Sequence, residues 1–253
     1  MQRMRPIHHP SQNHLLAALP GAELSTLAAD LELVPMVLGE MVGEPGKALR
    51  HVYFLTTAVV SLHQVTQNGA MAESAGVGFE GMVGIALFLG GNASPSSAMV
   101  QSGGHAYRLA RAPLAQALAR AGQLRQVLLR YTQTLIVQIG QTAACYRHHT
   151  IEQQLSRWLL STADRLPPGE LMMTQELVAG LLGVRRESIS EAASRLRDGG
   201  YIRYRRGHIS ILDPAGLETQ ACECYAAVKA EMQRLLPRMP APTDNAKPQI
   251  HHV

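Results

Sequence analysis

The sequence predicts an α+β protein with an N-terminal antiparallel β-roll, a long central helix and a C-terminal winged helix-turn-helix. Two patterns lead to this prediction. Short apolar runs alternate with glycine-rich turns between residues 31 and 110, whereas residues 174–212 show helical periodicity followed by a basic hairpin. A chain of 253 residues can hold two modest domains, each with its own core.

The helix-turn-helix carries the most specific pattern. Leu177, Leu181 and Leu182 form the apolar stripe of a first helix, and Gly183 provides the tolerance of positive φ that a tight turn between helices requires. The second helix is expected to bury four residues, namely Ile189, Ala192, Ala193 and Leu196. Two short strands, 201–204 and 208–211, then form a basic wing. A recognition helix of this kind presents its N-terminal end to the DNA major groove.

The segment before it predicts the roll. Residues 14–30 indicate two short helices separated by a Pro-Gly turn, and runs such as HVYFLTTAVVSLHQV follow as strands. Turns are expected at 43–46, 68–69, 76–78, 90–92 and 103–104. Short strands at this spacing, with an Asn-Gly hairpin signal, are typical of an antiparallel roll or barrel.

A long helix is predicted from about Pro113 to Arg147, with a slip in its apolar pattern near Gly122. Such a helix packs on its own domain or pairs with a twin, and we expect it to form a homodimer. The residues expected at the dimer contact are Leu124, Leu128, Tyr131, Leu135 and Ile139. A further amphipathic helix over residues 151–166 leads into the helix-turn-helix.

These patterns divide the chain into five expected parts. They are a disordered N-terminus (1–13), a β-roll sensor domain (14–111), a dimerisation helix (112–147), a winged helix-turn-helix domain (148–225), and a helix end with a disordered tail (226–253).

Charge is distributed unevenly along the chain. Residues 1–110 carry 5 basic and 7 acidic side chains, whereas residues 111–212 carry 14 and 7. Positive charge therefore accumulates in the half where a phosphate-facing surface would lie. No apolar run reaches the roughly 18 residues of a membrane span, and the N-terminus lacks the pattern of a signal peptide. The expected location is the cytoplasm, with no membrane partner.

Taken together, these pieces resemble the Crp/Fnr family of bacterial transcription regulators over roughly residues 14–225. The resemblance rests on EPGKALRHVYFLTTAVVSLHQV and EGMVGIALFLGG in the roll, and on IEQQLSRWLL, LLGVRRESIS and GGYIRYRRGHISILD after it. It implies a cyclic-nucleotide-binding-like roll and a homodimer that reads a pseudo-palindrome in double-stranded DNA. RNA polymerase is a further candidate partner.

The resemblance also implies which residues touch DNA. The family's base-reading positions correspond to Arg186 and Glu187. Glu191 is a third candidate, and it departs from the cyclic-AMP-responsive members, which look to have a base-reading Arg at this position. A carboxylate cannot bridge guanine, so a different half-site is expected. Alternatively, Glu191 pairs with Arg195 four residues later. Phosphate and wing contacts are expected from Thr174, Gln175, Arg185, Ser188, Ser190, Arg195, Arg203 and Arg206. Arg185 stands where a Ser or Thr would cap the helix.

The resemblance also implies a nucleotide pocket with two features. Nucleotide-binding members have a Gly-Glu whose carboxylate binds the ribose and a later Arg that neutralises the cyclic phosphate. Here Ile85 replaces the Glu, and a Ser within Ser94–Ser97 replaces the Arg. No Arg or Lys lies between Arg50 and Arg108. Because burying a phosphate without a cation is costly, cyclic AMP is not expected as the effector, which stays unidentified.

Cys145, Cys222 and Cys224, with the neighbouring His148 and His149, could hold a metal ion or a redox switch. The simpler interpretation is reduced cysteines packed between helices, and neither a metal nor a cofactor is predicted. Iron-sulfur members of the family place cysteines near the N-terminus, and residues 1–50 contain none.

Two other function classes are alternatives to a DNA-binding regulator. A dimeric interaction module that does not bind DNA would use the same basic wing. A cupin-like metal enzyme would need a His-x-His motif, but His63 is followed by Gln64 and Val65. Neither a Gly-x-Ser-x-Gly elbow nor a phosphate-cradling Gly-rich loop is present, so the protein is predicted not to be an enzyme.

Overall fold

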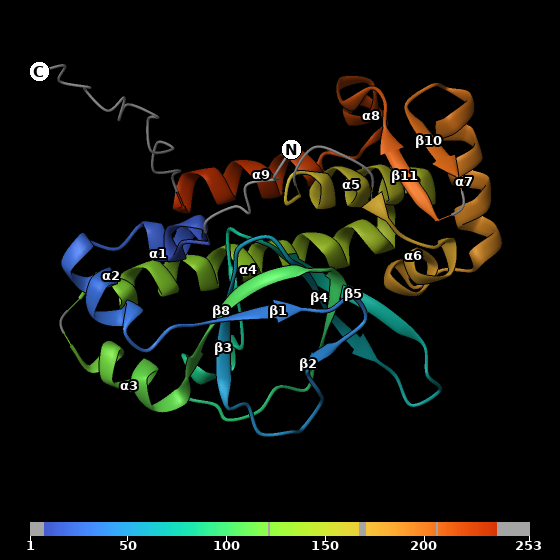
Figure 1. Ribbon diagram of the computed structural model, residues 1–253. Coiled ribbons are helices and arrows are strands. Elements are labelled where there is room, and N and C mark those ends of the chain that lie inside the picture. The colour runs from blue at the N-terminus through green and yellow to red at the C-terminus, as the bar shows by residue number, and fades with distance from the viewer. Residues whose placement is uncertain (1–7, 121, 167–170, 206, 237–253) are drawn as a thin grey trace, which may run out of the picture.

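A computed structural model describes residues 8–120, 122–166, 171–205 and 207–236. A β-roll of two antiparallel sheets forms one layer, a long helix crosses it, and the winged helix-turn-helix lies at one end of that helix (Figure 1). The predicted α+β architecture is therefore confirmed.

The roll is built from two four-stranded sheets with the strand orders β1-β8-β3-β6 and β2-β7-β4-β5. Their bounds are β1 Glu32–Met36, β2 Met41–Gly43, β3 His51–Leu55, β4 Val59–Val65, β5 Met71–Val77, β6 Met82–Val83, β7 Ser97–Ser102 and β8 Gly104–Ala110. Gly69, at φ 82°, forms the turn between β4 and β5, as the Asn-Gly signal predicts. Gly76 instead lies inside β5, so the turn expected at 76–78 begins only after Val77.

Five short helices accompany the described part of the roll. They are η1 Pro10–Gln12, α1 His14–Ala17, α2 Gly21–Ala28, η2 Ile85–Leu87 and α3 Arg111–Ala119. Asn13 is fully buried and donates both amide hydrogens to backbone carbonyls, those of Leu55 and Gly81, at 2.8 Å each. The expectation of disorder is therefore wrong for residues 8–13, because this buried amide anchors them to the roll.

The single helix expected over 112–147 is two helices. α3 ends at Ala119, Gly122 is extended, and α4 then runs over Gln123–His148. The carboxylate of Glu23 accepts hydrogen bonds from the backbone N–H groups of Gln123 and Leu124, at 2.9 Å each. It caps the start of α4 from another helix, because Gly122 itself has no side chain to do so.

The expected dimer contact is wrong for four of its five residues. Leu124, Leu128, Tyr131 and Leu135 are buried in the single chain, and the first three belong to the hydrophobic core of the roll. The Tyr131 hydroxyl also donates to the carbonyl of Met82 at 2.8 Å. The apolar periodicity arises because α4 packs on its own domain; Ile139 alone of the five is exposed.

The C-terminal half has its own core. Its elements are α5 Ile151–Ala163, β9 Leu171–Met172, α6 Gln175–Leu182, α7 Arg186–Asp198, β10 Ile202–Arg205, β11 His208–Ile211, α8 Pro214–Gln220 and α9 Cys224–Leu235. Trp158, Leu159, Leu181 and Leu196 are among its buried side chains. β9 adds a third strand to the predicted hairpin, in the order β10-β11-β9.

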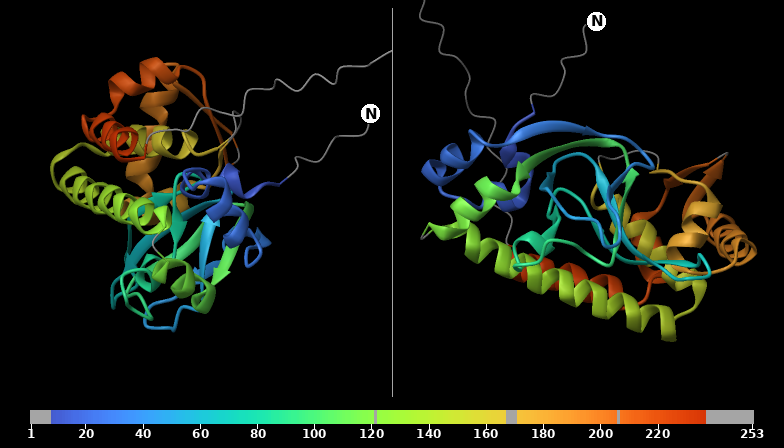
Figure 2. Two further views of the ribbon diagram at one scale, coloured as in Figure 1. Left: turned by 90° about the vertical axis from the view of Figure 1, so that its left-hand side faces the viewer. Right: turned by 90° about the horizontal axis from the view of Figure 1, so that it is seen from below.

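Helix α9 continues well past the boundary expected at residue 225 and lies along α4 (Figure 2). Gln133 of α4 donates to the carboxylate of Glu231 of α9 at 3.3 Å. The C-terminal segment thus returns from the winged helix-turn-helix toward the roll. Within the described residues, no helix combines the length and the apolarity that a bilayer crossing requires.

Candidate nucleic-acid interface

The first helix of the motif, α6, begins with a side-chain cap and ends with a glycine. The hydroxyl oxygen of Thr174 accepts the N–H of Leu177 at 3.2 Å, which satisfies one free donor of the first turn. Leu181 and Leu182 are buried as predicted, and Leu177 is half-buried. Gly183 takes the left-handed conformation at φ 68° and turns the chain into α7. The sequence pattern therefore produces the predicted helix-turn-helix.

Helix α7 has one buried and one exposed face. Its four buried residues are those predicted, Ile189, Ala192, Ala193 and Leu196. Arg185, Arg186, Glu187 and Glu191 are exposed. None of these four side chains makes a hydrogen bond or an ion pair to another described residue. They are therefore available to a ligand outside the chain.

The N-terminal end of α7 has no side-chain cap, because Arg185 occupies the N-cap position. The first N–H groups of a helix carry partial positive charge, and here the guanidinium groups of Arg185 and Arg186 add to it. Such an end attracts anions, phosphate included.

Besides Thr174, three of the expected contact residues are engaged within the domain, namely Gln175, Ser190 and Arg195. The Ser190 hydroxyl donates to the side-chain carbonyl of Gln175 at 2.6 Å, so α7 and the start of α6 are joined there. Arg195 pairs with Glu152 at the start of α5, with an Nε–Oε2 distance of 2.5 Å. Glu191 is thus not paired with Arg195, and that alternative is wrong. Ser188 is half-buried.

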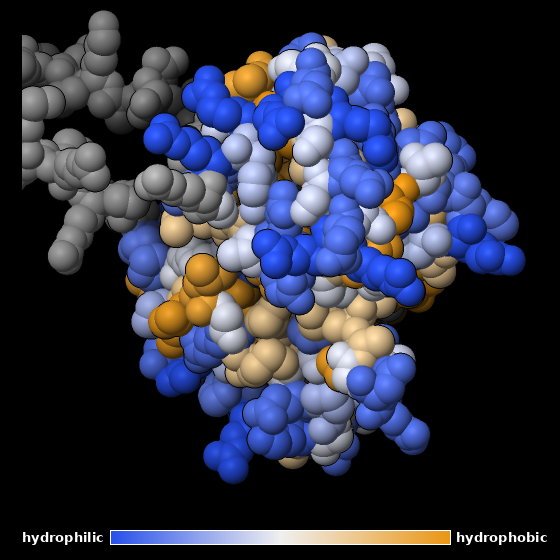
Figure 3. Space-filling view, turned by 90° about the vertical axis from the view of Figure 1, so that its right-hand side faces the viewer, coloured by the Kyte–Doolittle hydropathy of each residue, from blue (hydrophilic) through white to orange (hydrophobic). Residues whose placement is uncertain are grey.

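The wing places further positive charge beside α7, against which β10 packs. Arg203 and Arg205 alternate along β10 and are both exposed, and Gly207, at φ 82°, makes the turn to β11. Arg206 lies outside the described residues. Figure 3 shows that hydrophilic side chains dominate the upper part of the face that carries this domain. Such a surface suits a charged, hydrated ligand better than an apolar one.

The motif is docked on the roll through α6, away from the exposed face of α7. A Cβ on Gly180 would lie 2.8 Å from the Met71 methyl carbon of β5, so the small residue permits this approach. The same boundary buries an ion pair between Arg165, in the turn after α5, and Glu80 of the roll, at 2.6 Å. It also buries a hydrogen bond from the Trp158 indole N–H to the carboxylate of Glu73, at 3.0 Å.

Glu73 is a buried carboxyl group at this boundary. Burial raises its pKa, and the nearby guanidinium groups of Arg157 and Arg165 and the hydrogen bond from Trp158 oppose the rise in part. The boundary between the roll and the winged helix-turn-helix domain therefore contains ionisable groups held away from water.

The residues that replace the expected nucleotide-binding Glu and Arg make contacts within the roll. Ile85, in η2, packs against the core of the roll. The serines that replace the expected Arg bond locally: Ser96 accepts from Gln64 at 2.5 Å, and the Ser94 hydroxyl accepts the N–H of Ser96 at 3.1 Å. Ser97 is buried at the start of β7.

The structure also brings together the three cysteines and one of the two histidines that the sequence analysis considers as a possible metal or redox group. Cys145 and His149 meet Cys222 and Cys224, which lie more than seventy residues later in the chain. The spacing of Cys145 and His149, one helical turn apart, together with the CxC pair, is the only signal for this cluster in the sequence.

Comparison with known proteins gives the following matches. Residues 153–220 match a family model described as a Crp-like helix-turn-helix domain. No curated protein sequence matches the chain.

Three similar solved structures illustrate the likeness of the whole fold. FixK2 from Bradyrhizobium japonicum is 17% identical with a TM-score of 0.66, and the match covers 76% of this chain and 98% of that one. TTHB099, a CRP-family transcriptional regulator from Thermus thermophilus, is 20% identical with a TM-score of 0.62, covering 74% and 96%. CLP from Xanthomonas campestris, described as a c-di-GMP-responsive global regulator, is 14% identical with a TM-score of 0.61, covering 76% and 99%.

Proposed function

We propose that this chain, which has the Crp/Fnr regulator fold with a Crp-like helix-turn-helix at residues 153–220, is a homodimeric, sequence-specific DNA-binding transcription regulator. The observation that carries the proposal is the exposed start of α7, where Arg186 and Glu187 have no partner among the described residues. An unpaired Arg and Glu at this end of a recognition helix are suited to base edges in the major groove.

The residues divide into two roles. Arg186 is proposed to donate to O6 and N7 of guanine, and Glu187 to accept from N4 of cytosine, with Glu191 reaching a base one helical turn further along α7. Arg185 and Arg203 are proposed to bind phosphate oxygens, as is the hydroxyl hydrogen of Thr174, which its helix cap leaves unused.

Ser190 and Arg195 take other roles in this proposal than direct phosphate contact. The Ser190 hydroxyl donates to the side-chain carbonyl of Gln175 and so holds the Gln175 amide in one orientation. The N–H groups of that amide then have a fixed direction. Arg195 holds α7 against the start of α5 through Glu152. Both residues thus position the groups that touch DNA.

The dimer is proposed to form on the exposed third face of α4. One face of this helix packs on the roll, and a second is covered by α9. The remaining face carries Leu129, Ile136 and Ile139, which are 46%, 64% and 40% exposed. Their spacing of seven and three residues is that of a coiled-coil seam. Pairing two α4 helices there would remove these side chains from water.

Two α7 helices in such a dimer would enter successive major grooves, with half-sites about 34 Å apart. The roll is proposed not to bind cyclic AMP in the manner of nucleotide-binding relatives, because its local serines and Ile85 supply no charge to a phosphate.

The test begins by selecting bound duplexes from a random DNA library with the full chain. Fluorescence anisotropy with the selected duplex and a scrambled one then gives two affinities over a range of salt concentrations. We expect tighter binding to the selected duplex and a steep loss of affinity with salt, because phosphate contacts release counterions. Failure to enrich any sequence would contradict the proposal and favour a protein interaction module.

A further inference from the structure

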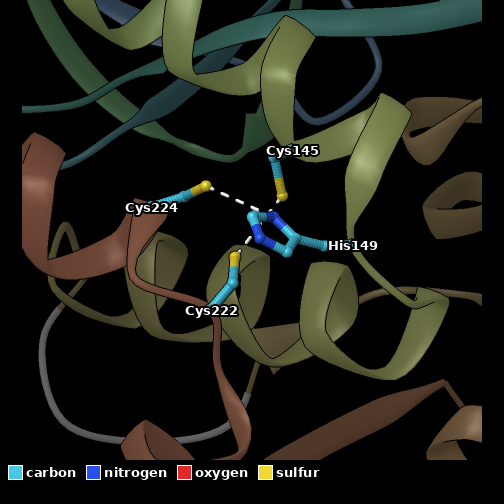
Figure 4. A group of neighbouring side chains, drawn as sticks. All are labelled: Cys145, His149, Cys222 and Cys224. Atoms are coloured by element: carbon cyan, nitrogen blue, oxygen red, sulfur yellow. Dashed lines mark hydrogen bonds between the residues drawn. The ribbon is translucent and has the colours of Figure 1, made fainter.

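Three thiols and one imidazole converge where α4 ends (Figure 4). The sulfur atoms of Cys145, Cys222 and Cys224 and one ring nitrogen of His149 all lie within 4.8 Å of one another. Cys145 Sγ is 3.5 Å from Cys222 Sγ, and Cys224 Sγ is 3.5 Å from His149 Nδ1. The three cysteines are buried and His149 is half-buried.

Two segments supply these side chains. Cys145 and His149 are four residues apart, so they project from the same side of the last turn of α4, where His149 is the C-cap. Cys222 lies in the short connection between α8 and α9, and Cys224 is the first residue of α9. The ends of three helices thus deliver the group.

Polar neighbours orient the ligand atoms. The Nε2 atom of His149 lies 3.2 Å from the carboxylate of Glu223, which leaves Nδ1 directed toward the thiols. Gln141 donates to Cys224 Sγ at 3.1 Å. A carboxylate behind a ligating histidine and a donor to a ligating sulfur are typical supports of a metal site.

We propose that Cys145, His149, Cys222 and Cys224 bind one tetrahedral Zn²⁺ ion. With Zn–S and Zn–N bonds of about 2.3 Å and 2.0 Å, the edges of a tetrahedron are about 3.8 Å between sulfurs and about 3.5 Å between sulfur and nitrogen. The two 3.5 Å contacts match these edges, and the 4.8 Å span is longer by about 1 Å, a difference that small side-chain rotations remove. Coordination replaces three S–H bonds by S–Zn bonds and releases three protons to solvent.

Two other uses of the cluster fit less well. An iron-sulfur cluster holds its thiolates on different iron atoms, which requires a wider arrangement than four ligands around one point. A disulfide between Cys145 and Cys222 would need its sulfurs about 2.05 Å apart and would leave Cys224 and His149 without a role. The convergence of all four ligands on one position favours a single ion.

The site would connect the end of α4 to the segment that follows the winged helix-turn-helix. Zn²⁺ bound there fixes α9 on α4 and hence the path by which the chain returns to the roll. The proposal goes beyond DNA binding and does not depend on it, because the cluster is separate from α7.

The experiment uses the full chain, purified under reducing conditions from zinc-supplemented cells. Metal content is measured by mass spectrometry of the protein, and release of Zn²⁺ is followed with a chromogenic chelator after thiol modification. The variants are Cys222→Ser and His149→Ala, and the matched control is His148→Ala, because His148 is exposed on the preceding residue of the same helix. Circular dichroism establishes that each variant is folded.

We expect about one Zn²⁺ per chain in the wild type and in His148→Ala, and at least a tenfold loss in Cys222→Ser. Replacement of Zn²⁺ by Co²⁺ in the wild type should produce thiolate-to-cobalt charge transfer and the visible bands of tetrahedral cobalt. These bands should weaken in His149→Ala. Glu223→Gln should keep the bands but lower the affinity for Co²⁺ by about 10- to 100-fold, as loss of a supporting carboxylate does.

Several outcomes would overturn the proposal. One is a wild-type chain that purifies without metal and gives no cobalt bands. Others are equal metal content in wild type and folded Cys222→Ser, a disulfide between Cys145 and Cys222 in the reduced preparation, or iron with acid-labile sulfide. Each of these results leaves the DNA-binding measurements untouched, so the two proposals fail separately.

Discussion

Arg165, in the turn that follows α5, donates its Nε–H to the carboxylate of Glu80 across the boundary between the winged helix-turn-helix domain and the roll, at 2.6 Å. The two side chains are only 7% and 10% exposed. Arg165 also donates to the carbonyl of Ser161 at 2.7 Å, and a Cβ on Gly78 would lie 2.8 Å from its own Cβ. The boundary is thus built around one buried ion pair, which fixes how α5 lies on the roll.

Removal of one partner should destabilise the protein strongly. In Arg165→Ala, Glu80 would keep a buried charge without its cation, and we expect the free energy of unfolding to fall by about 3–5 kcal/mol. Urea denaturation measures the change. The double variant Glu80→Leu with Arg165→Met should recover much of the loss, because it leaves no unpaired charge.

The pair of Arg234 and Glu231 on α9 provides the comparison, because its Arg234 side chain is 60% exposed. Solvent screens such a pair, so Arg234→Ala should change the stability little. Equal losses of unfolding free energy in Arg234→Ala and Arg165→Ala would show that burial does not make the pair of Arg165 and Glu80 more important for stability.

Glu73 predicts a pH dependence of stability at the same boundary. Burial raises its pKa above the ordinary value of 4.5, so the folded state binds the proton more tightly than the unfolded state. The contribution of Glu73 to the free energy of unfolding is therefore complete when the pH is below 4.5, and it is lost as the pH rises through the raised pKa of the folded state. Glu73→Gln keeps an acceptor for the Trp158 indole but does not titrate.

Thermal unfolding of Glu73→Gln and wild type should therefore diverge with pH. We expect the variant to gain stability relative to the wild type from weakly acidic to weakly basic pH. His63, whose pKa is lowered by burial, lies opposite Glu73 in the sheet register, so the same comparison in a His63→Gln background separates the titration of Glu73 from that of His63. A difference that stays constant with pH would show that Glu73 is not protonated in the folded state.

Local patterns predicted the helix-turn-helix correctly. The apolar spacing of α7 assigns Ile189 and Leu196 to the core, and the same spacing places Arg186 and Glu187 on the exposed face. Gly183 ends α6 because a left-handed residue is needed there. These features depend on residues only a few positions apart in the chain, so they can be predicted from the sequence.

Partners distant in the chain could not be predicted in this way. The periodicity of α4 indicates that Leu128 is buried, but it does not say whether the roll or a second chain buries it. Arg195 pairs with Glu152, 43 residues earlier, and not with Glu191. The cysteine cluster joins segments 77 residues apart, as between Cys145 and Cys222. Only the tertiary structure supplies these contacts.

The exposed stripe of α4 predicts that Ile136→Asp yields monomers. Ile136 is 64% exposed in the single chain, so a charge there costs little in a monomer but is buried in the proposed dimer. We expect analytical ultracentrifugation to show a shift from dimer to monomer with an unchanged circular dichroism spectrum.

Arg130→Asp on the same helix is the control for Ile136→Asp. Arg130 is exposed and lies roughly 120° around the helix from Ile136 and roughly 100° from Leu129, away from the stripe. The variant should remain dimeric. If Ile136→Asp also sediments as a dimer, the chains associate through another surface.

Cyclic AMP should not bind the roll with micromolar affinity. The chain has no Arg or Lys between Arg50 and Arg108, and Ile85 packs against the core where relatives would present a carboxylate. Isothermal titration calorimetry on a preparation that binds its selected duplex should therefore give no saturable heat. A micromolar dissociation constant would contradict the proposed loss of the nucleotide site.

Arg186→Ala should weaken binding to the selected duplex by about 1–3 kcal/mol, because a bidentate contact to guanine is lost. The same variant should bind scrambled DNA nearly as well as the wild type does, and repeated selection should show relaxed preference at one position of each half-site. Anisotropy titrations on both duplexes measure the two effects.

Arg197→Ala separates base reading from charge. Arg197 lies at the opposite end of α7 and pairs with Asp198 at 2.9 Å, so its loss removes the same formal charge from the same helix without touching the proposed base contact. We expect this variant to retain the preference for the selected duplex. Equal losses for Arg186→Ala on selected and scrambled DNA would instead assign Arg186 to phosphate, because a phosphate contact carries no sequence information.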